Sequence, residues 1–126
     1  MRDPNFVLLY VDDPAASATF YTTLLGRAPV EASPTFALFV LGSGLQLGLW
    51  SRHTVEPAPA ALGGASELGF PVADATAVDA TYDDWRARGL AMAQPPTAMD
   101  FGRTFVALDP DGHRLRVFAP AHPPAA

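Results

Sequence analysis

The side chains that most often do chemistry are few in this chain, and their spacing supports no catalytic or metal-binding pattern. There are three histidines, His53, His113 and His122, and no cysteine. Without cysteine, disulfides, thiolate zinc sites and cysteine nucleophiles are excluded. The histidines fall in a proline-rich segment, beside a turn and near the C-terminus, so we expect them at solvated surface positions. No nucleophile–histidine–acid spacing and no glycine-rich phosphate loop is found.

A second group of side chains alternates along apolar segments and indicates a binding site instead. Side chains of a strand alternate between its two faces, and the regular apolar set should face a helix. The residues expected on the opposite face are Phe6, Tyr10, Gln46, Trp50, Glu67, Arg114, Arg116 and Phe118. Aromatic walls with a few polar groups are typical of a small-molecule cavity. The alternative is that the aromatics belong to a core or an interface, and that Glu67 and Arg116 simply pair with each other.

The elements that would carry the first of these residues read as strand, helix and three strands. Segment 5–11 is apolar and β-prone, and Asp13 with Pro14 can begin a helix that runs to about Leu25. Gly26 can end it in a left-handed conformation. The spacing predicts that Ala16, Phe20 and Leu24 share the inner face of this helix. Three further strands are expected at 28–32, 35–41 and 45–50.

The second half repeats this pattern. A strand at 66–72 precedes a helix that Asp74 or Thr76 could cap and Gly89 could end. Its inner face is expected to hold Val78, Tyr82 and Trp85. Three more strands are expected at 90–94, 103–108 and 114–118. The offset of 61 that carries Asp13 onto Asp74 grows to 68 near the end of each half, where Trp50 falls on Phe118.

The repeat predicts an α+β fold of two tandem βαβββ modules, whose curved mixed sheets surround a cavity. We place the first module at 1–52, a linker at 53–65, the second module at 66–119 and a tail at 120–126. Together they would form one domain, because 126 residues with 49% hydrophobic content suit one shared core.

The composition limits the classes of partner that this chain is expected to bind. The net charge is −5 and every basic residue is arginine, which disfavours nucleic acid and would mildly attract a cationic small molecule. No run of about 18 apolar residues is present, so we expect no membrane span. No signal-peptide cleavage pattern follows Met1, so we expect a cytoplasmic protein.

Two stretches make the repeat resemble a known family. FVLLYVDDPAASATFYTTLLG and FVALDPDGHRLRVFAP resemble the opening and the closing hairpin of the vicinal-oxygen-chelate superfamily, which includes glyoxalase, bleomycin-resistance protein and extradiol dioxygenase. In its metal-dependent members four strand positions hold a divalent ion. By register these positions are Phe6, Gly48, Glu67 and Arg116 here, and only Glu67 could be a ligand. The resemblance therefore implies no metal and no cofactor.

The resemblance is to the metal-free, antibiotic-binding resistance proteins of this superfamily. It implies that Trp50, Phe101 and Phe118 bind an aromatic or amphipathic ligand. Phe101 lies within the segment Asp100–Arg103. We include Arg103 among the binding residues. One alternative is an enzyme with an atypical site, either a metal-dependent lyase or dioxygenase or a metal-free isomerase that uses Glu67 as a base. The other is an interaction module without a ligand. The resemblance also implies a homodimer, in which modules pair within a chain or are exchanged between chains.

The proposed Glu67–Arg116 pair carries an energetic expectation. If the pair is buried, Glu67→Gln should cost about 3–5 kcal/mol, because it leaves a buried charge without a partner.

Overall fold

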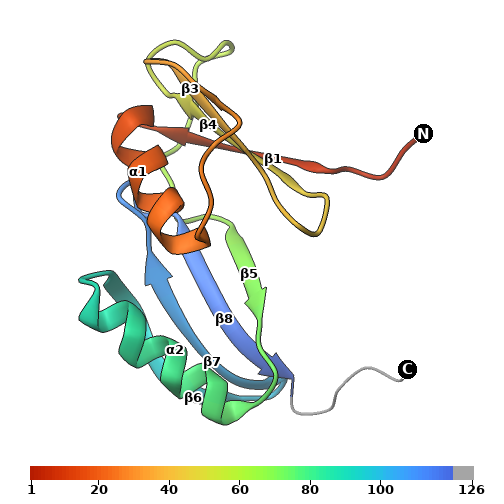
Figure 1. Ribbon diagram of the computed structural model, residues 1–126, viewed down its shortest axis with the longest axis vertical. Coiled ribbons are helices and arrows are strands. Elements are labelled where there is room, and N and C mark those ends of the chain that lie inside the picture. The colour runs from red at the N-terminus through yellow and green to blue at the C-terminus, as the bar shows by residue number, and fades with distance from the viewer. Residues whose placement is uncertain (121–126) are drawn as a thin grey trace. The chain divides into compact units, whose positions relative to one another are not determined.

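The computed structural model describes residues 1–120 and divides into two compact units, Met1–Gly63 and Gly64–Ala126. Each unit contains one helix and one four-stranded mixed sheet (Figure 1). The first unit is built from β1 (Phe6–Val11), α1 (Pro14–Leu25), β2 (Glu31–Ala32), β3 (Phe36–Val40) and β4 (Gln46–Ser51). The second is built from β5 (Glu67–Pro71), α2 (Ala75–Ala87), β6 (Ala91–Met99), β7 (Gly102–Leu108) and β8 (Arg114–Pro120).

The two sheets have the same topology. Their strand orders are β1-β4-β3-β2 and β5-β8-β7-β6. In each, the first strand runs parallel to the last, and the other neighbours are antiparallel. A parallel pair needs a long crossover, and each unit supplies it with a helix and two strands. The predicted tandem βαβββ fold is therefore confirmed.

Helix α1 begins and ends as predicted but buries a different face. The Asp13 carboxylate accepts hydrogen bonds from the amides of Ala15 (3.0 Å) and Ala16 (3.4 Å), and Gly26 ends the helix at φ 68°. The predicted inner face of Ala16, Phe20 and Leu24 is wrong, because the buried residues are Pro14, Ser17 and Tyr21. The helix packs through Tyr21, whose ring lies edge-on to Phe39 of β3 at 6.5 Å. In a helix rich in alanine, both stripes have helical spacing, so the pattern alone does not separate them.

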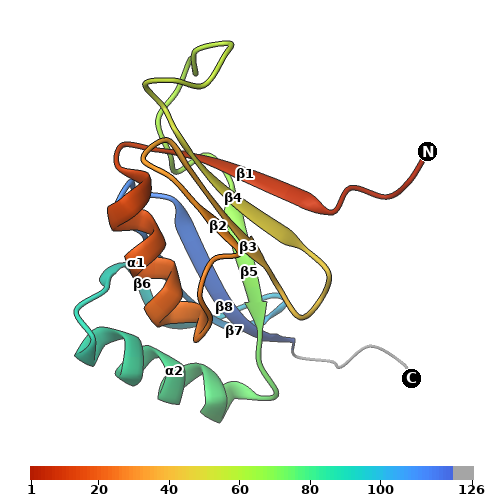
Figure 2. The ribbon, with the colours of Figure 1, turned by 45° about the horizontal axis from the view of Figure 1, so that its top comes forward.

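Helix α2 matches its prediction. Asp74, rather than Thr76, is the cap, accepting a hydrogen bond from the amide of Ala77 at 2.8 Å. Val78 and Trp85 are buried. The helix packs against β6, β7 and β8, and Figure 2 shows it alongside the sheet of its own unit. Neither α1 nor α2, the helices of residues 1–120, is long and apolar enough to cross a membrane.

Three strands differ clearly in length from the predictions. The strand expected at 28–32 is shortened to Glu31–Ala32. The strand expected at 90–94 continues to Met99, and its pairing with β7 shifts register around Gln94. Pro95 and Pro96 lie within this stretch and have no amide hydrogen to donate, which explains the irregular ladder. The strand expected to end at Phe118 continues to Pro120, so Ala119 is buried in β8. The remaining tail, including His122, lies outside the described residues.

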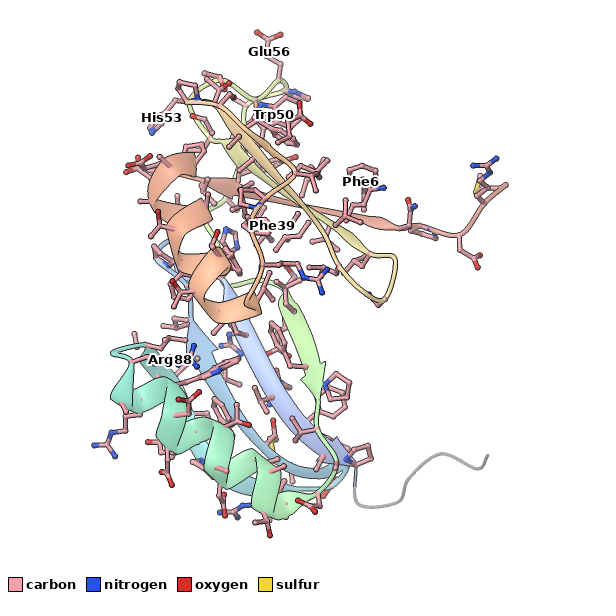
Figure 3. The ribbon with its side chains drawn as sticks, viewed as in Figure 1. Phe6, Phe39, Trp50, His53, Glu56 and Arg88 are labelled. Atoms are coloured by element: carbon pink, nitrogen blue, oxygen red, sulfur yellow. The ribbon has the colours of Figure 1, made fainter. Side chains whose placement is uncertain are left out.

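The predicted alternation of faces is confirmed. Towards the helices lie the buried Leu9, Val11, Leu47 and Leu49 in the first unit and Leu115 and Val117 in the second. Phe39 belongs to this core face, whereas Phe6 projects from β1 on the side away from α1 (Figure 3). The side chains predicted for a binding site on β1, β4, β5 and β8 therefore lie on the helix-free faces.

Candidate functional site

A two-pronged ion pair forms the centre of the helix-free face of the second sheet. Strands β5 and β8 run parallel, with Glu67 opposite Arg114 and Gly69 opposite Arg116. Arg116 donates from Nε to Glu67 Oε1 (2.7 Å) and from Nη2 to Glu67 Oε2 (2.9 Å). Two parallel N–H···O bonds fix the relative orientation of both groups as well as their separation. The sequence predicted this pairing as the alternative to a ligand-binding role for the two side chains, and the structure shows that the pair forms.

The third nitrogen of Arg116 is also engaged. Nη1 donates to Thr104 Oγ1 at 3.2 Å and to Gln94 Oε1 at 3.4 Å. Thr104 is buried, and its own hydroxyl donates to the Val117 carbonyl at 2.8 Å. All three guanidinium nitrogens therefore have partners, and β5, β6, β7 and β8 each contribute to the network.

Arg114 supplies a second, looser cation. Its Nη1 lies 3.5 Å from Glu67 Oε2. The Arg114 side chain is 47% exposed, whereas that of Arg116 is 20% exposed. The same face thus carries two guanidinium groups around one carboxylate.

The network determines the ionisation of Glu67. The hydrogen bond from Arg116 lowers the pKa of Glu67, with a smaller contribution from Arg114, although desolvation acts in the opposite direction. The same bond raises the pKa of Arg116. A carboxylate whose pKa is lowered is a weaker base, so this environment disfavours Glu67 as a general base near neutral pH.

An open hollow lies beside this network. Its volume is about 420 Å³, and it is lined by Glu67, Met99, Phe101, Arg116 and Phe118. The rings of Phe101 and Phe118 meet edge to face at 6.4 Å and 77°, and Phe101 is 45% exposed. Gly69 makes room for this wall, since a Cβ there would lie 3.3 Å from Phe118 Cε1. One side of the hollow is therefore apolar and aromatic, and the other is charged.

The remaining side chains predicted for the binding site lie on the first sheet. Phe6, Tyr10, Gln46 and Trp50 belong to the helix-free face of β1 and β4. Trp50 meets Phe36 edge to face at 6.1 Å and 89°. Tyr10 also lines a separate hollow of about 330 Å³ with Arg52, His53 and residues 58–62.

Arg103, which the sequence placed among the binding residues, is not among the residues that line the hollow beside Glu67. Its Nε donates to Asp79 Oδ1 of α2 at 2.8 Å. Arg103 therefore points towards the helix, and its neighbour Thr104 points to the site. Alternation along β7 requires this, because only one of two consecutive residues can face the hollow.

His53 and His113, the histidines within residues 1–120, both have hydrogen-bond partners. His53 is exposed (Figure 3). Its Nε2 lies 2.7 Å from Asp12 Oδ1. That hydrogen bond, together with the charge of Arg52, lowers the pKa of Asp12. His113 is half-buried, and its amide donates to Asp109 Oδ1 at 2.9 Å in the turn before β8. Neither histidine lies among the residues that line the hollow beside Glu67.

The divalent ion of the metal-dependent relatives does not fit these residues. Within residues 1–120, no three histidine or acidic side chains come together as a metal site. Both oxygens of Glu67 bind Arg116, whose positive charge would repel a cation. At Gly48, a Cβ would lie 2.5 Å from Leu8 Cδ2 and 3.2 Å from the Phe36 ring, so these side chains occupy the space that a ligand would need.

Sequence reasoning missed several residues of the site. These are Gln94, Met99 and Thr104. Thr104 could have been found by alternation from Arg103. Gln94 and Met99 could not, because the register shifts in β6 change which residues face the hollow.

Acid should weaken the Glu67–Arg116 pair, and Glu67→Gln should reduce this sensitivity. The folded-state pKa of Glu67 lies below its ordinary value of 4.5, so the folded chain binds fewer protons than the unfolded chain in this range. The pair stabilises the fold fully above pH 4.5, and this contribution is lost as the pH falls through the lowered pKa. Urea unfolding between pH 3 and 7 should show a shallower acid slope for Glu67→Gln.

The expected size is smaller than for a buried pair. The Glu67 side chain is 32% exposed, so we revise the cost of Glu67→Gln at neutral pH to about 1 kcal/mol. Asp84→Asn is the matched control, because Asp84 forms an exposed pair with Arg88 on α2. An unchanged acid slope in Glu67→Gln would show that the pair contributes nothing to stability.

The comparisons with known proteins agree with this architecture. The family described as Glyoxalase/Bleomycin resistance protein/Dioxygenase superfamily matches residues 4–117. A phenazine antibiotic resistance protein, EhpR, of Enterobacter agglomerans is 30% identical over 117 residues, covering 90% of this chain and 89% of that protein.

Two solved structures support the same assignment. An Agrobacterium tumefaciens protein solved by solution NMR is 57% identical, with a TM-score of 0.89, and the match covers 97% of this chain and 100% of that one. A glyoxalase/bleomycin resistance protein/dioxygenase from Nocardioides is 29% identical, with a TM-score of 0.82, and covers 100% of this chain and 90% of its own. This chain belongs to the glyoxalase/bleomycin resistance protein/dioxygenase superfamily.

Proposed function

We propose that this chain is a metal-independent binding protein that sequesters a planar, amphipathic antibiotic of the phenazine type. The observation that carries the proposal is that one hollow is lined both by the Phe101–Phe118 wall and by the Glu67–Arg116 pair. The similarity to a phenazine antibiotic resistance protein over most of both chains supports it.

The residues of the hollow suit binding better than bond-making. Phe101 and Phe118 can bury a flat ring, and each aromatic contact contributes roughly 0.5–1.5 kcal/mol beyond the burial of area. Glu67 and Arg116 satisfy each other, so they can orient polar groups at the ring edge without a proton transfer. Sequestration requires no more than this, because a bound antibiotic cannot reach its target.

Isothermal titration calorimetry with phenazine-1-carboxylate tests the proposal. Purified protein should bind it saturably with a dissociation constant near the micromolar range, which corresponds to about −8 kcal/mol. Chromatography of the released ligand should return it unchanged. Absence of saturable binding would refute the proposal, and recovery of an altered ligand would favour the enzymatic alternative.

Protection of cells should be stoichiometric rather than catalytic. A sensitive bacterium that expresses the chain should survive phenazine concentrations up to roughly the amount of binding sites and no further. Protection that continues far beyond this equivalence would indicate turnover of the antibiotic.

We also propose that the chain forms a homodimer. On the helix-free side of the first sheet, Phe6, Leu8, Tyr10 and Val40 are each 39–49% exposed. A contiguous apolar face of this kind is typical of an interface, and a second copy can cover it by two-fold symmetry. Light scattering at micromolar concentration should give twice the chain mass of 13.3 kDa.

Charge placed on this face should dissociate the dimer. Leu8→Glu should give the 13.3 kDa species, whereas Val30→Glu should not, because Val30 is 66% exposed and precedes β2. A wild-type chain of 13.3 kDa at every concentration would contradict the dimer.

A further inference from the structure

The charges on the helix-free face of the second sheet do not cancel. The whole chain carries −5, yet the charged side chains on this face are Arg114 and Arg116 around Glu67. The local sum of one negative and two positive groups is +1. The net charge of the chain predicts a cationic ligand, whereas the positive sum at this face favours an anionic ligand.

The two arginines differ in their capacity to bind a further group. Arg116 uses Nε and Nη2 on Glu67 and Nη1 on Thr104 and Gln94. Arg114 contacts Glu67 through Nη1 alone, at 3.5 Å, which is the longest of the Glu67 contacts. A guanidinium has five N–H donors, so Arg114 retains the donors that a second carboxylate needs.

We infer that the ligand of this hollow is an aromatic carboxylate, whose rings lie against Phe118 and Phe101 and whose carboxylate extends past the lining residues to Arg114, which lies 3.5 Å from Glu67 Oε2 at the edge of the hollow. This inference rests on the proposed function and specifies its ligand class. A cationic drug would meet a net positive face, and the carboxylate of Glu67 is already bound by Arg116 on both oxygens.

The spacing along β8 is compatible with such a ligand. Arg114, Arg116 and Phe118 occupy alternate positions on one face, so Arg114 and Phe118 are about 13 Å apart along the strand. A fused three-ring system together with a flexible arginine side chain can cover this length. Asp100, which precedes Phe101 in the turn after β6, is exposed and carries a negative charge next to the aromatic wall in sequence, so the positive end of this face is the one at Arg114, at the other end of β8 from Phe118.

The test compares two ligands that differ only in charge. Calorimetry is performed on the full chain with phenazine-1-carboxylate and with phenazine-1-carboxamide. The acid should bind at least about tenfold more tightly than the amide at low salt, and this preference should shrink in 0.5 M NaCl, because salt screens exposed charges. Arg114→Gln should remove the preference by weakening the acid alone.

Arg103→Gln is the matched control. It removes the same charge from the same unit, but Arg103 lies on the helix side and pairs with Asp79. It should leave both affinities unchanged. Thermal melts of both variants should match the wild type, since both side chains are partly exposed and paired at the surface.

Each outcome is decisive for one of the two proposals. Equal binding of acid and amide would overturn the carboxylate inference and leave the proposed function intact. If Arg114→Gln lowered the affinity for the acid and the amide equally, the inference would also be overturned, because Arg114 would then stabilise the site without recognising the charge of the ligand. If neither phenazine binds, the proposed function fails, and the acid and amide of anthracene then decide whether the hollow prefers an anion.

Discussion

Replacing Phe118 with alanine is expected to weaken the binding of phenazine-1-carboxylate by about ten- to a hundredfold. Phe118 lines the hollow and forms its aromatic wall with Phe101 at 6.4 Å. Removing the ring eliminates an aromatic contact of about 0.5–1.5 kcal/mol together with the burial of its apolar area, and each 1.4 kcal/mol is a factor of ten. Calorimetry measures the change directly.

Two further variants separate stacking from simple burial. Phe118→Leu keeps much of the apolar bulk and should lose only the ring contribution, so its affinity should be intermediate. Phe101→Ala should lose less than Phe118→Ala, because Phe101 lies in the turn before β7 and is 45% exposed. Wild-type affinity in Phe118→Ala would show that the ligand does not occupy this hollow.

The centre of the site could be predicted because strand alternation is strict. Glu67 on β5 and Arg116 on β8 were placed on one face by a period of two, and the structure joins them by two hydrogen bonds. Phe118 follows Arg116 on the same face for the same reason. The repeat of the strand–helix–three-strand pattern likewise predicted both sheets.

The errors have local physical causes. Arg103 was included among the binding residues, but on β7 it is Thr104 that contacts Arg116 on the site face, whereas Arg103 binds Asp79 of α2. Gln94 and Met99 were missed because register shifts interrupt the alternation of β6. A bulge is not visible in the apolar pattern of one strand, because it depends on the pairing with its neighbour.

The inner face of α1 was mispredicted because the helix offers weak contrast. Tyr21, which is fully buried, was not recognised, although it packs against Phe39. A phenol ring suits either the buried or the exposed face of a helix. The small residues between the aromatics give no difference in hydrophobicity between the two faces. By contrast, α2 alternates acidic and apolar residues, so the buried Trp85 could be identified from the sequence.

Among the proposed substitutions, Phe105→Ala is expected to lower the free energy of unfolding most, while leaving the ligand affinity nearly unchanged. Phe105 is fully buried on β7, and its ring lies edge to face with Tyr82 at 5.4 Å and with Trp85 at 5.5 Å. Truncating such a ring leaves a cavity and typically costs about 3–5 kcal/mol. Urea unfolding followed by the fluorescence of Trp85, in a Trp50→Phe background, measures the loss for this unit.

The same variant tests whether the core face and the site face of the second sheet are separable. Phe105 points to α2, whereas its neighbour Thr104 accepts a hydrogen bond from Arg116 on the opposite face. The affinity of the folded fraction should therefore stay within about twofold of wild type, since differences that small are under 0.5 kcal/mol. Phe105→Leu, which leaves a smaller cavity, keeps the comparison possible if the alanine variant does not fold. A folded Phe105 variant with normal stability and no binding would show that the ligand reaches the helix side of the sheet, which contradicts the placement of the site beside Glu67.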